Sequence, residues 1–306
     1  MNGEKTAILI AGPTASGKSA AALELAQALD GVVINADSMQ VYRDLRVLTA
    51  RPSPREEAAA PHALYGHVDA AERYSVGRWL ADARRVAEEA WAAGRVPIFT
   101  GGTGLYFRAL EEGLADVPAV PEAVRAQVAA LVDEGGVAAL REEAARRGMR
   151  RVPEDRQRLV RALEVLVATG RELHTFHGGE LPVLGQGVRL SRVFIAPDRA
   201  WLRERIATRF QAMLKEGAVE EVRRLLARGL DASLPAMKAH GVRNIAAALR
   251  GEINMEEAAE GAINETRQYA KRQMTWARRF MGDWAWVDDT GEVAREVLAC
   301  GKRPEE

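Results

Sequence analysis

The sequence contains Gly12-Pro13-Thr14-Ala15-Ser16-Gly17-Lys18-Ser19, which fits the phosphate-binding pattern G-x-x-x-x-G-K-[ST] at every fixed position. The apolar run 6–11 before it is typical of a buried parallel strand, and the run 20–29 after it is rich in helix formers. A strand, loop and helix in this order direct backbone N–H groups and a helix N-terminus at one point, which favours an anion. We therefore expect residues 12–19 to bind a phosphate or a diphosphate, with Lys18 adding positive charge and the Ser19 hydroxyl ligating a shared Mg²⁺.

The composition indicates a globular protein of the cytoplasm. The 306 residues are 47% hydrophobic and 28% charged, and 43 basic residues balance 43 acidic ones, so a bulk nucleic-acid coat protein is disfavoured. A single cysteine, Cys300, excludes an internal disulfide and a cysteine-cluster metal site, which suits a reducing compartment. No apolar run approaches the ~18 residues of a membrane span, and a core strand already occupies the position of a signal peptide. We expect no contact with a membrane.

The first part of the chain reads as an α/β domain. A second apolar run, 31–36, ends at Asp37, and a third, 95–100, runs into Gly101 after a helix expected over 75–93. The segment 51–67 between them is expected to be an irregular crossing. Successive strand-turn-helix units predict a parallel sheet flanked by helices, as in P-loop NTPases, with its ligands beyond the carboxyl ends of the strands.

The middle of the chain changes character. A proline-marked boundary at 116–121 is followed by a helical pattern dense in arginine over 122–169 and by a loop over 181–187. Apolar and polar residues alternate over 188–196, which predicts a further strand of the core sheet. The remainder is mostly helical, with a short final strand near 284–287. We therefore predict a core formed by residues 1–115 and 188–306, with an all-helical insertion domain over 116–187.

Asp37 is the first candidate for chemistry, because the end of its strand places it near the phosphate loop. As a helix N-cap it would have only a structural role, and Asp is among the best N-cap residues. As a functional group it would be a general base or a Mg²⁺ ligand. The polar groups of Ser38, Met39 and Gln40, which follow it, could hold the edge of a planar base.

The third strand ends in Thr100-Gly101-Gly102-Thr103, where many phosphate-loop nucleotidases have a strand ending in Asp. The missing carboxylate disfavours hydrolysis of ATP or GTP. Two glycines beside a hydroxyl at this edge indicate either a tight turn or a close approach of the backbone to a ligand, and we favour the ligand.

Two arginine-rich runs remain. Seven arginines lie between 146 and 161, and five cations with no acid lie between 267 and 279, where Tyr269 and Trp276 are interleaved. A cationic run is usually a solvated face, but two such runs with aromatic residues favour a nucleic-acid clamp. The histidines lack metal-ligand spacing apart from the pair His174 and His177, which lies in a loop, and we expect no metal there.

Taken together, these segments resemble the tRNA dimethylallyltransferases, also called tRNA isopentenyltransferases, nearly from end to end. The resemblance rests on six segments in order: 12–19, Asp37-Ser38-Met39-Gln40-Val41-Tyr42, Thr49-Ala50-Arg51-Pro52, Gly101-Gly102-Thr103-Gly104-Leu105-Tyr106, Asp155-Arg156-Gln157-Arg158-Leu159-Val160-Arg161 with the residues to Val165, and Thr266-Arg267-Gln268-Tyr269-Ala270-Lys271-Arg272-Gln273. The phosphate loop alone is common to many nucleotidases, whereas the full set in this order is highly specific.

The resemblance implies transfer of a dimethylallyl group from dimethylallyl diphosphate to N6 of the adenosine immediately 3′ of the anticodon in tRNA. It implies that residues 12–19 bind the donor diphosphate, with Lys18 and Mg²⁺ on Ser19 stabilising the leaving group, that Asp37 takes the proton of the attacking amine, and that Thr103 orients the reacting groups. It also implies tRNA contacts from the following residues: Asp37, Ser38, Met39, Gln40, Thr103, Arg125, Gln157, Arg158, Leu159, Val160 and Arg161. We expect the protein to be a monomer.

The chain departs from the family pattern at two places. The chain has Lys238-Ala239-His240-Gly241-Val242-Arg243-Asn244 where the family usually has an Ile-Gly-Tyr-type segment. It also has Arg51 in place of a lysine and His62-Ala63 in place of paired histidines. No role is assigned to these positions.

Three alternatives remain open. An adenylate isopentenyltransferase would use the same donor on a free nucleotide, but it would not need an arginine-rich insertion. A small-molecule kinase would use Asp37 to hold metal, and the missing strand-end carboxylates count against it. A non-catalytic RNA-binding module would not need Asp37, Lys18 and Thr103 together.

Overall fold

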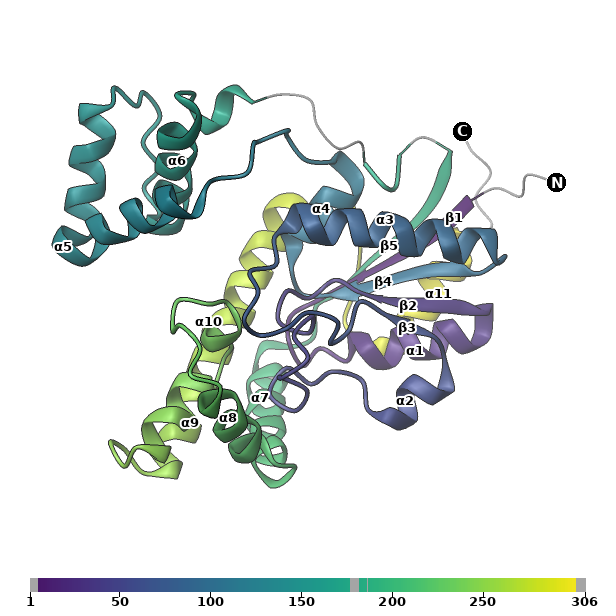
Figure 1. Ribbon diagram of the computed structural model, residues 1–306. Helices are drawn as coiled ribbons and strands as arrows, with labels where there is room; N and C mark the ends of the chain where they lie inside the picture. The colour runs from purple at the N-terminus through teal and green to yellow at the C-terminus, as the bar shows by residue number, and fades with distance from the viewer. Residues whose placement is uncertain (1–4, 177–181, 186, 301–306) are drawn as a thin grey trace. The chain divides into compact units, whose positions relative to one another are not determined.

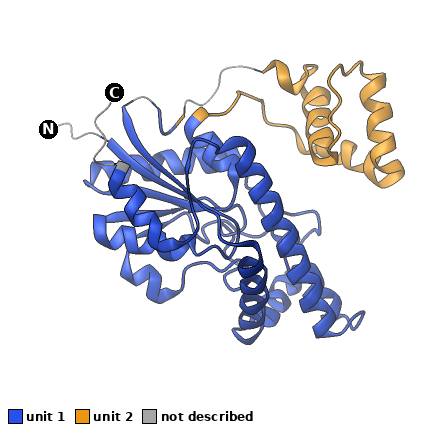
Figure 2. Cartoon of the chain, turned by 180° about the vertical axis from the view of Figure 1, so that it is seen from behind, with its two compact units in different colours: residues 1–111, 183–306 blue, residues 112–182 orange. Residues whose placement is uncertain are grey.

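The computed structural model describes residues 5–176, 182–185 and 187–300. The chain forms two compact units, one comprising residues 1–111 and 183–306 and the other comprising residues 112–182 (Figure 2). The boundaries of the second unit lie within five residues of the insertion expected over 116–187. Most of the loop expected over 181–187 is described, except for residues 181 and 186, which lie outside the described residues together with His177.

A six-stranded parallel sheet organises the first unit, as predicted (Figure 1). Its strands are β1 (Lys5–Ala11), β2 (Gly31–Asn35), β3 (His62–Ala63), β4 (Val96–Gly101), β5 (Val188–Ile195) and β6 (Ala285–Val287), in the order β3-β2-β4-β1-β5-β6. The register pairs Ala11 with Gly101 and Asn35 with Thr100, so that β1, β2 and β4 end at one level. The phosphate loop, Asp37 and Thr103 therefore leave the sheet at the same edge.

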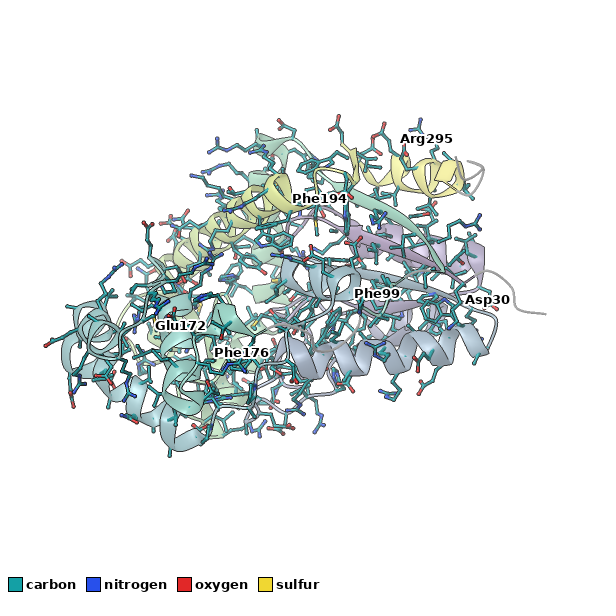
Figure 3. The ribbon with its side chains drawn as sticks, turned by 90° about the horizontal axis from the view of Figure 1, so that it is seen from above. Asp30, Phe99, Glu172, Phe176, Phe194 and Arg295 are labelled. Atoms are coloured by element: carbon teal, nitrogen blue, oxygen red, sulfur yellow. The ribbon has the colours of Figure 1, made fainter. Side chains whose placement is uncertain are left out.

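Helices cover both faces of the sheet, which explains why its central strands are apolar throughout. One face packs against α1 (Lys18–Leu29) and α11 (Thr290–Cys300), with Leu25 and Val293 in the shared core. The other face packs against α3 (Val76–Ala92) and α4 (Gly104–Glu112), where the ring of Trp79 meets that of Phe99 edge-on. Figure 3 labels Phe99 on β4 and Phe194 on β5, and both side chains are fully buried.

The segment 51–67 is more regular than expected. It contains α2 (Pro54–Ala59) and the edge strand β3. The short helix forms because Ser53 caps it: the Ser53 hydroxyl accepts from the Glu56 N–H, and the Glu56 carboxylate accepts from the Ser53 N–H. The capping box and the proline at the first helical position are local signals of a helix start. The expectation of an irregular segment rested on its richness in alanine, proline and charge and did not use these signals.

A second hydrophobic core lies beyond the strand ends, among α7 (Arg199–Lys215), α8 (Ala218–Ala227), α9 (Val242–Leu249) and α10 (Met255–Phe280). The short 3-10 helix η2 (Ala236–Lys238) joins α8 to α9. The loop after Asp37 packs into this core through Val41, Tyr42 and Leu45. The C-terminal helices therefore fix the segment that carries several of the predicted site residues.

The second unit is helical, with α5 (Glu122–Arg146), α6 (Arg156–Thr169) and the 3-10 helix η1 (Leu173–Thr175). Gly136, with φ of 61°, interrupts α5. Leu140, Leu159 and Leu163 form its core. Glu172 and Phe176, labelled in Figure 3, stabilise the end of this unit: the Glu172 carboxylate accepts from the N–H groups of Arg150 and Arg151, and Arg171 lies over the Phe176 ring.

Among the described residues, no helix combines the length and the apolar character that crossing a membrane would require.

Candidate active site

The phosphate loop has the backbone shape of an anion site. Ala15 and Gly17 adopt left-handed conformations, with φ of 65° and 94°, and α1 begins directly afterwards at Lys18. The first N–H groups of a helix have no partner within it, so those of α1 are directed into the loop. The Ser16 hydroxyl is buried and, among the described residues, has no hydrogen-bond partner, which leaves it available to an anion.

Two cations from distant parts of the chain, Lys18 of the loop itself and Arg209 of α7, interact electrostatically with one another and with Asp37. The Lys18 ammonium lies over the loop and donates to the Pro13 carbonyl oxygen at 3.2 Å. Burial of the ammonium lowers the pKa of Lys18 to about 8, with Asp37 opposing and Arg209 adding to the shift. Burial also lowers the pKa of Arg209, on α7, although Asp37 opposes this shift. The paired positive charges suit a diphosphate better than a single phosphate.

Asp37 lies at the centre of the site, because its charge reaches groups on six other segments. It affects the pKa values of Lys18 and Arg209, and those of four aromatic or imidazole side chains, namely Tyr65, Tyr106, His240 and Tyr269. Its Oδ1 accepts from the Met39 N–H at 2.9 Å, which closes a tight turn. No helix begins here, so the N-cap alternative does not apply.

Thr103 supports the Asp37 turn from the neighbouring strand. Its Oγ1 accepts from the Ser38 N–H at 3.0 Å, and its own N–H donates to the Ala36 carbonyl oxygen at 3.2 Å. Asn35 completes the arrangement, since its side chain accepts from the Asp37 N–H and donates to the Asp37 carbonyl oxygen. Asp37 and Thr103 are therefore held beside one another, on adjacent strands.

The two glycines before Thr103 make close contacts within the protein, and packing alone accounts for them, whereas the expected close approach of the backbone to a ligand stays a prediction. A Cβ on Gly101 would lie 2.1 Å from the Ala36 carbonyl group, and a Cβ on Gly102 would lie 2.1 Å from Nε2 of Gln273. Both positions exclude any side chain because β2 and α10 pack directly against this turn.

Aromatic residues form the wall around Asp37. Burial raises the pKa of Tyr106 and of Tyr269, and the Asp37 charge adds to both shifts. Tyr106 stacks on Trp79 with ring centroids 4.0 Å apart, and Tyr269 packs against His240 at 4.8 Å. Burial lowers the pKa of His240, so its ring favours the neutral form. Neutral aromatic groups around a carboxylate suit a site that receives a planar base.

The residues after Asp37 differ in whether their side chains are exposed at the site or hydrogen-bonded within their own loop. Ser38 and Met39 are partly exposed beside Asp37. The Gln40 side-chain amide donates to the carbonyl oxygens of Thr49 and Ala50, so it holds its own loop and its N–H groups are not directed outward. Arg51, which replaces the family's lysine, also donates inward, to the carbonyl oxygens of Tyr42 and Arg43.

The loop after Asp37 is further anchored by a carboxylate that the sequence did not single out. Glu221 on α8 is buried and accepts from the N–H groups of Arg46, Val47 and Leu48 at 2.7–2.9 Å. A buried charge is stabilised by such hydrogen bonds, so this loop is tied to the helical core.

In the second unit, the predicted tRNA-binding residues divide into two sets. Gln157 and Arg158 are exposed in the first turn of α6, which Asp155 caps. Arg125 and Arg161 are partly exposed. Leu159 is fully buried in the core of this unit, so its side chain cannot contact RNA, and Val160 is half-buried against the same core. The helical period places these two on the inner face of α6.

Two residues that the sequence did not select as site residues complete the arrangement. Arg209 resembles any helix-surface arginine in sequence, and only the packing of α7 brings it to Asp37. Gln273, on α10, accepts from the Thr14 N–H and donates to the Gly102 carbonyl oxygen. The only sequence signal for Gln273 was its place at the end of the segment 266–273.

The donor set fits a magnesium ion that is shared with substrate. The described residues contain no cluster of three His, Cys, Asp or Glu side chains that could hold a metal. Ser19, in the first turn of α1, has an exposed hydroxyl. Mg²⁺ usually keeps several waters and needs only one or two protein oxygens when substrate phosphates supply the others.

A parallel sheet with a phosphate loop at its edge places the protein in the P-loop class, and the loop suits a phosphate or a diphosphate. Comparison with known proteins makes the class specific. The family model for IPP transferase matches residues 40–280, and a model for isopentenyl transferase matches residues 5–61. The chain belongs to the IPP transferase family.

Similar proteins carry names that agree with this family. The tRNA dimethylallyltransferase of Methylobacterium nodulans is 59% identical over 95% of this chain and 98% of its own length. That of Nitrobacter hamburgensis is 54% identical over 97% and 95%. The solved tRNA isopentenylpyrophosphate transferase of Bacillus halodurans is 31% identical, covers 98% of this chain and 99% of its own, and has a TM-score of 0.68. A eukaryotic dimethylallyltransferase acting on tRNA is 26% identical, covers 93% and 74%, and has a TM-score of 0.73.

Proposed function

We propose that this enzyme transfers a dimethylallyl group from dimethylallyl diphosphate to N6 of the adenosine 3′-adjacent to the anticodon in tRNA, releasing diphosphate. One observation carries the proposal: the charge of Asp37 acts on both Lys18, in the phosphate loop, and Arg209, on α7. A base and an anion cradle in one site are what the transfer of an allylic group from a diphosphate to an amine requires. The names of the relatives support tRNA as the acceptor.

At the donor end, residues 12–19 bind the diphosphate, through the backbone N–H groups of the loop and the start of α1. Lys18 and Arg209 stabilise the negative charge that grows on the diphosphate as its bond to the allylic carbon breaks. Ser19, together with the diphosphate oxygens, would hold Mg²⁺, which supplies further charge stabilisation when bound.

At the acceptor end, the N6 amine of adenine attacks the allylic carbon, forming the new C–N bond as the C–O bond to diphosphate breaks. Asp37 accepts the proton that N6 loses, and Thr103 holds the Asp37 turn in place through Ser38. The target base must leave its stack to reach Asp37. In the single-stranded anticodon loop this unstacking costs little free energy. Ser38 and Met39 lie where they would contact that base.

The remaining tRNA contacts come from the second unit. Arg158 and Gln157 lie in the exposed first turn of α6, where a helix N-terminus and an arginine side chain both favour a phosphate. Arg125 and Arg161 would add charge. Because one chain supplies every group named here, we propose a monomer, acting in the cytoplasm where tRNA is found.

The test is a transfer assay with radiolabelled dimethylallyl diphosphate and Mg²⁺, offered separately to bulk tRNA and to AMP. Label in tRNA alone is expected. Label in AMP would instead make the protein an adenylate isopentenyltransferase. Label in neither, with consumption of ATP in a parallel reaction, would reject the isoprenoid donor in favour of a kinase.

A further inference from the structure

Gln273 is the one side chain of α10 that joins the two halves of the site. It is nine-tenths buried, with 9% of its surface exposed. Its Oε1 accepts from the Thr14 N–H at 2.9 Å, and its Nε2 donates to the Gly102 carbonyl oxygen at 2.9 Å. Thr14 belongs to the phosphate loop after β1, and Gly102 belongs to the turn after β4. One carboxamide therefore bridges the ends of two neighbouring strands.

The bridge has a tight fit. A Cβ on Gly102 would come within 2.1 Å of Gln273 Nε2, so even an alanine would displace the carboxamide. Each end of the carboxamide has a distinct role, because the oxygen can only accept and the nitrogen can only donate. Replacing the nitrogen by oxygen would therefore break one hydrogen bond and keep the other.

The bridge also lies between the two reacting ends. Thr14 is part of the donor cradle, whereas Gly102 directly precedes Thr103, whose hydroxyl accepts from the Ser38 N–H beside Asp37. A shift of either loop would change the distance from the diphosphate to the base that takes the N6 proton. Displacements of about 1 Å in such geometry can cost on the order of 10²-fold in rate.

We propose that Gln273 is a positioning residue, which sets the separation between the phosphate loop and the Asp37–Thr103 side of the site. The inference rests on the proposed function, since it assigns Gln273 to the same transfer. Gln273 acts on the reaction through the loop and the turn and need not touch either substrate.

The variants Gln273→Glu and Gln273→Ala test this inference in the full-length protein. Q273E keeps the shape and the acceptor for Thr14, but it places an oxygen against the Gly102 carbonyl oxygen. Q273A removes both hydrogen bonds, together with the contact of the carboxamide with the Tyr269 hydroxyl. We expect kcat for labelling of tRNA to fall about 10- to 100-fold in both, while the Kd for tRNA stays within about threefold of the unchanged protein and the melting temperature stays within a few degrees.

Gln27→Glu is the matched control, because Gln27 is exposed near the far end of α1, outside the site, and the change in charge is identical. It should leave kcat unchanged. Gly102→Ala gives an independent approach: it should lower kcat in the parent protein but cost much less in the Q273A background, where the new methyl group has room.

The outcomes distinguish a failure of the positioning role from a failure of the proposed function. If the parent protein labels tRNA but Q273E and Q273A do so within threefold of its kcat, the positioning role is rejected and the proposed function stands. A loss of kcat that follows the loss of folded protein, or fully additive effects of G102A and Q273A, would also reject it. If the parent protein labels nothing, the proposed function fails and this inference fails with it.

Discussion

The charge of Asp37 is the feature to which the other residues of the site respond, since it shifts the pKa values of two cations and four ring-bearing side chains. Its Oδ1 also accepts from the Met39 N–H, so the same carboxylate shapes its own turn. A substitution that keeps the hydrogen bond but removes the basic group separates these two roles.

Asp37→Asn should therefore reduce kcat by about 10²-fold or more and leave tRNA binding nearly unchanged. The Asn side-chain oxygen can still accept from the Met39 N–H, but an amide cannot take the N6 proton. Single-turnover transfer and a tRNA binding isotherm would measure the two effects. Turnover within a few-fold of the parent protein would contradict the assignment of Asp37 as the base.

Lys18 makes donor binding depend on pH. Because its pKa is lowered to about 8, the ammonium of the free protein loses its proton as the pH rises through about 8. The protonated form binds the diphosphate, so the affinity for inorganic pyrophosphate should fall by up to about tenfold per pH unit above that value. Calorimetric titrations between pH 6.5 and 9.5 would show this.

Lys18→Arg is the control for this pH dependence, since a guanidinium stays charged throughout the range. The ratio of the two affinities cancels the ionisation of pyrophosphate itself. A ratio that does not change between pH 7 and 9.5 would show that Lys18 keeps its proton.

Among the elements, α8 illustrates how a helix outside the sheet shapes the site. Its Glu221 accepts from three successive backbone N–H groups in the loop after Asp37, and Arg228, just beyond α8, pairs with Asp44 and Asp69. The loop has no regular secondary structure, so its conformation depends on these side-chain acceptors.

Glu221→Ala should lower the free energy of unfolding by about 3 kcal/mol, because it leaves three N–H groups without their acceptor in a largely buried environment. Urea unfolding followed by circular dichroism would measure it. Glu220→Gln, an exposed change on the same helix, should cost under about 0.5 kcal/mol. Equal effects of the two substitutions would show that Glu221 does not anchor the loop.

At the scale of the whole molecule, the first unit contains the candidate active site and the second unit contains most of the proposed RNA-binding residues. The chain leaves the first unit after Glu111 and returns at Val183, and the Leu184 N–H donates to the Leu110 carbonyl oxygen at 2.9 Å. The two crossing points are therefore adjacent, so the sheet needs no residue of the second unit to close.

The double substitution of Arg156 and Arg158 by Ala should weaken tRNA binding and leave pyrophosphate binding unchanged. If each arginine contacts one phosphate, the slope of log Kd against log salt should decrease by about 2. Filter binding between 50 and 300 mM KCl would measure the slope. Arg85→Ala, which removes an exposed partner of Glu89 in the first unit, serves as the control. An unchanged slope would exclude both arginines from the RNA contact.

Local signals in the sequence were sufficient for most of the architecture. The apolar strands, the helix expected over 75–93 and the final strand expected near 284–287 were all predicted, because strand burial and helical periodicity depend on neighbouring residues. The alternation over 188–196 likewise predicted β5. The short helix over 54–59 was missed because its capping box lies in a segment with no hydrophobic period.

By itself, the sequence determined the phosphate loop, the parallel sheet and the family, since each rests on residue types at fixed spacings. The electrostatic coupling of Arg209 to Asp37, the bridge that Gln273 makes from Thr14 to Gly102 and the burial of Leu159 all arise from the tertiary packing. The physical reason is that an arginine or glutamine on a helix has the same local pattern whether it faces solvent or a neighbouring strand. The two hydrogen-bond partners of Gln273 lie 171 and 259 residues away in the sequence, so no local sequence pattern can predict these bonds.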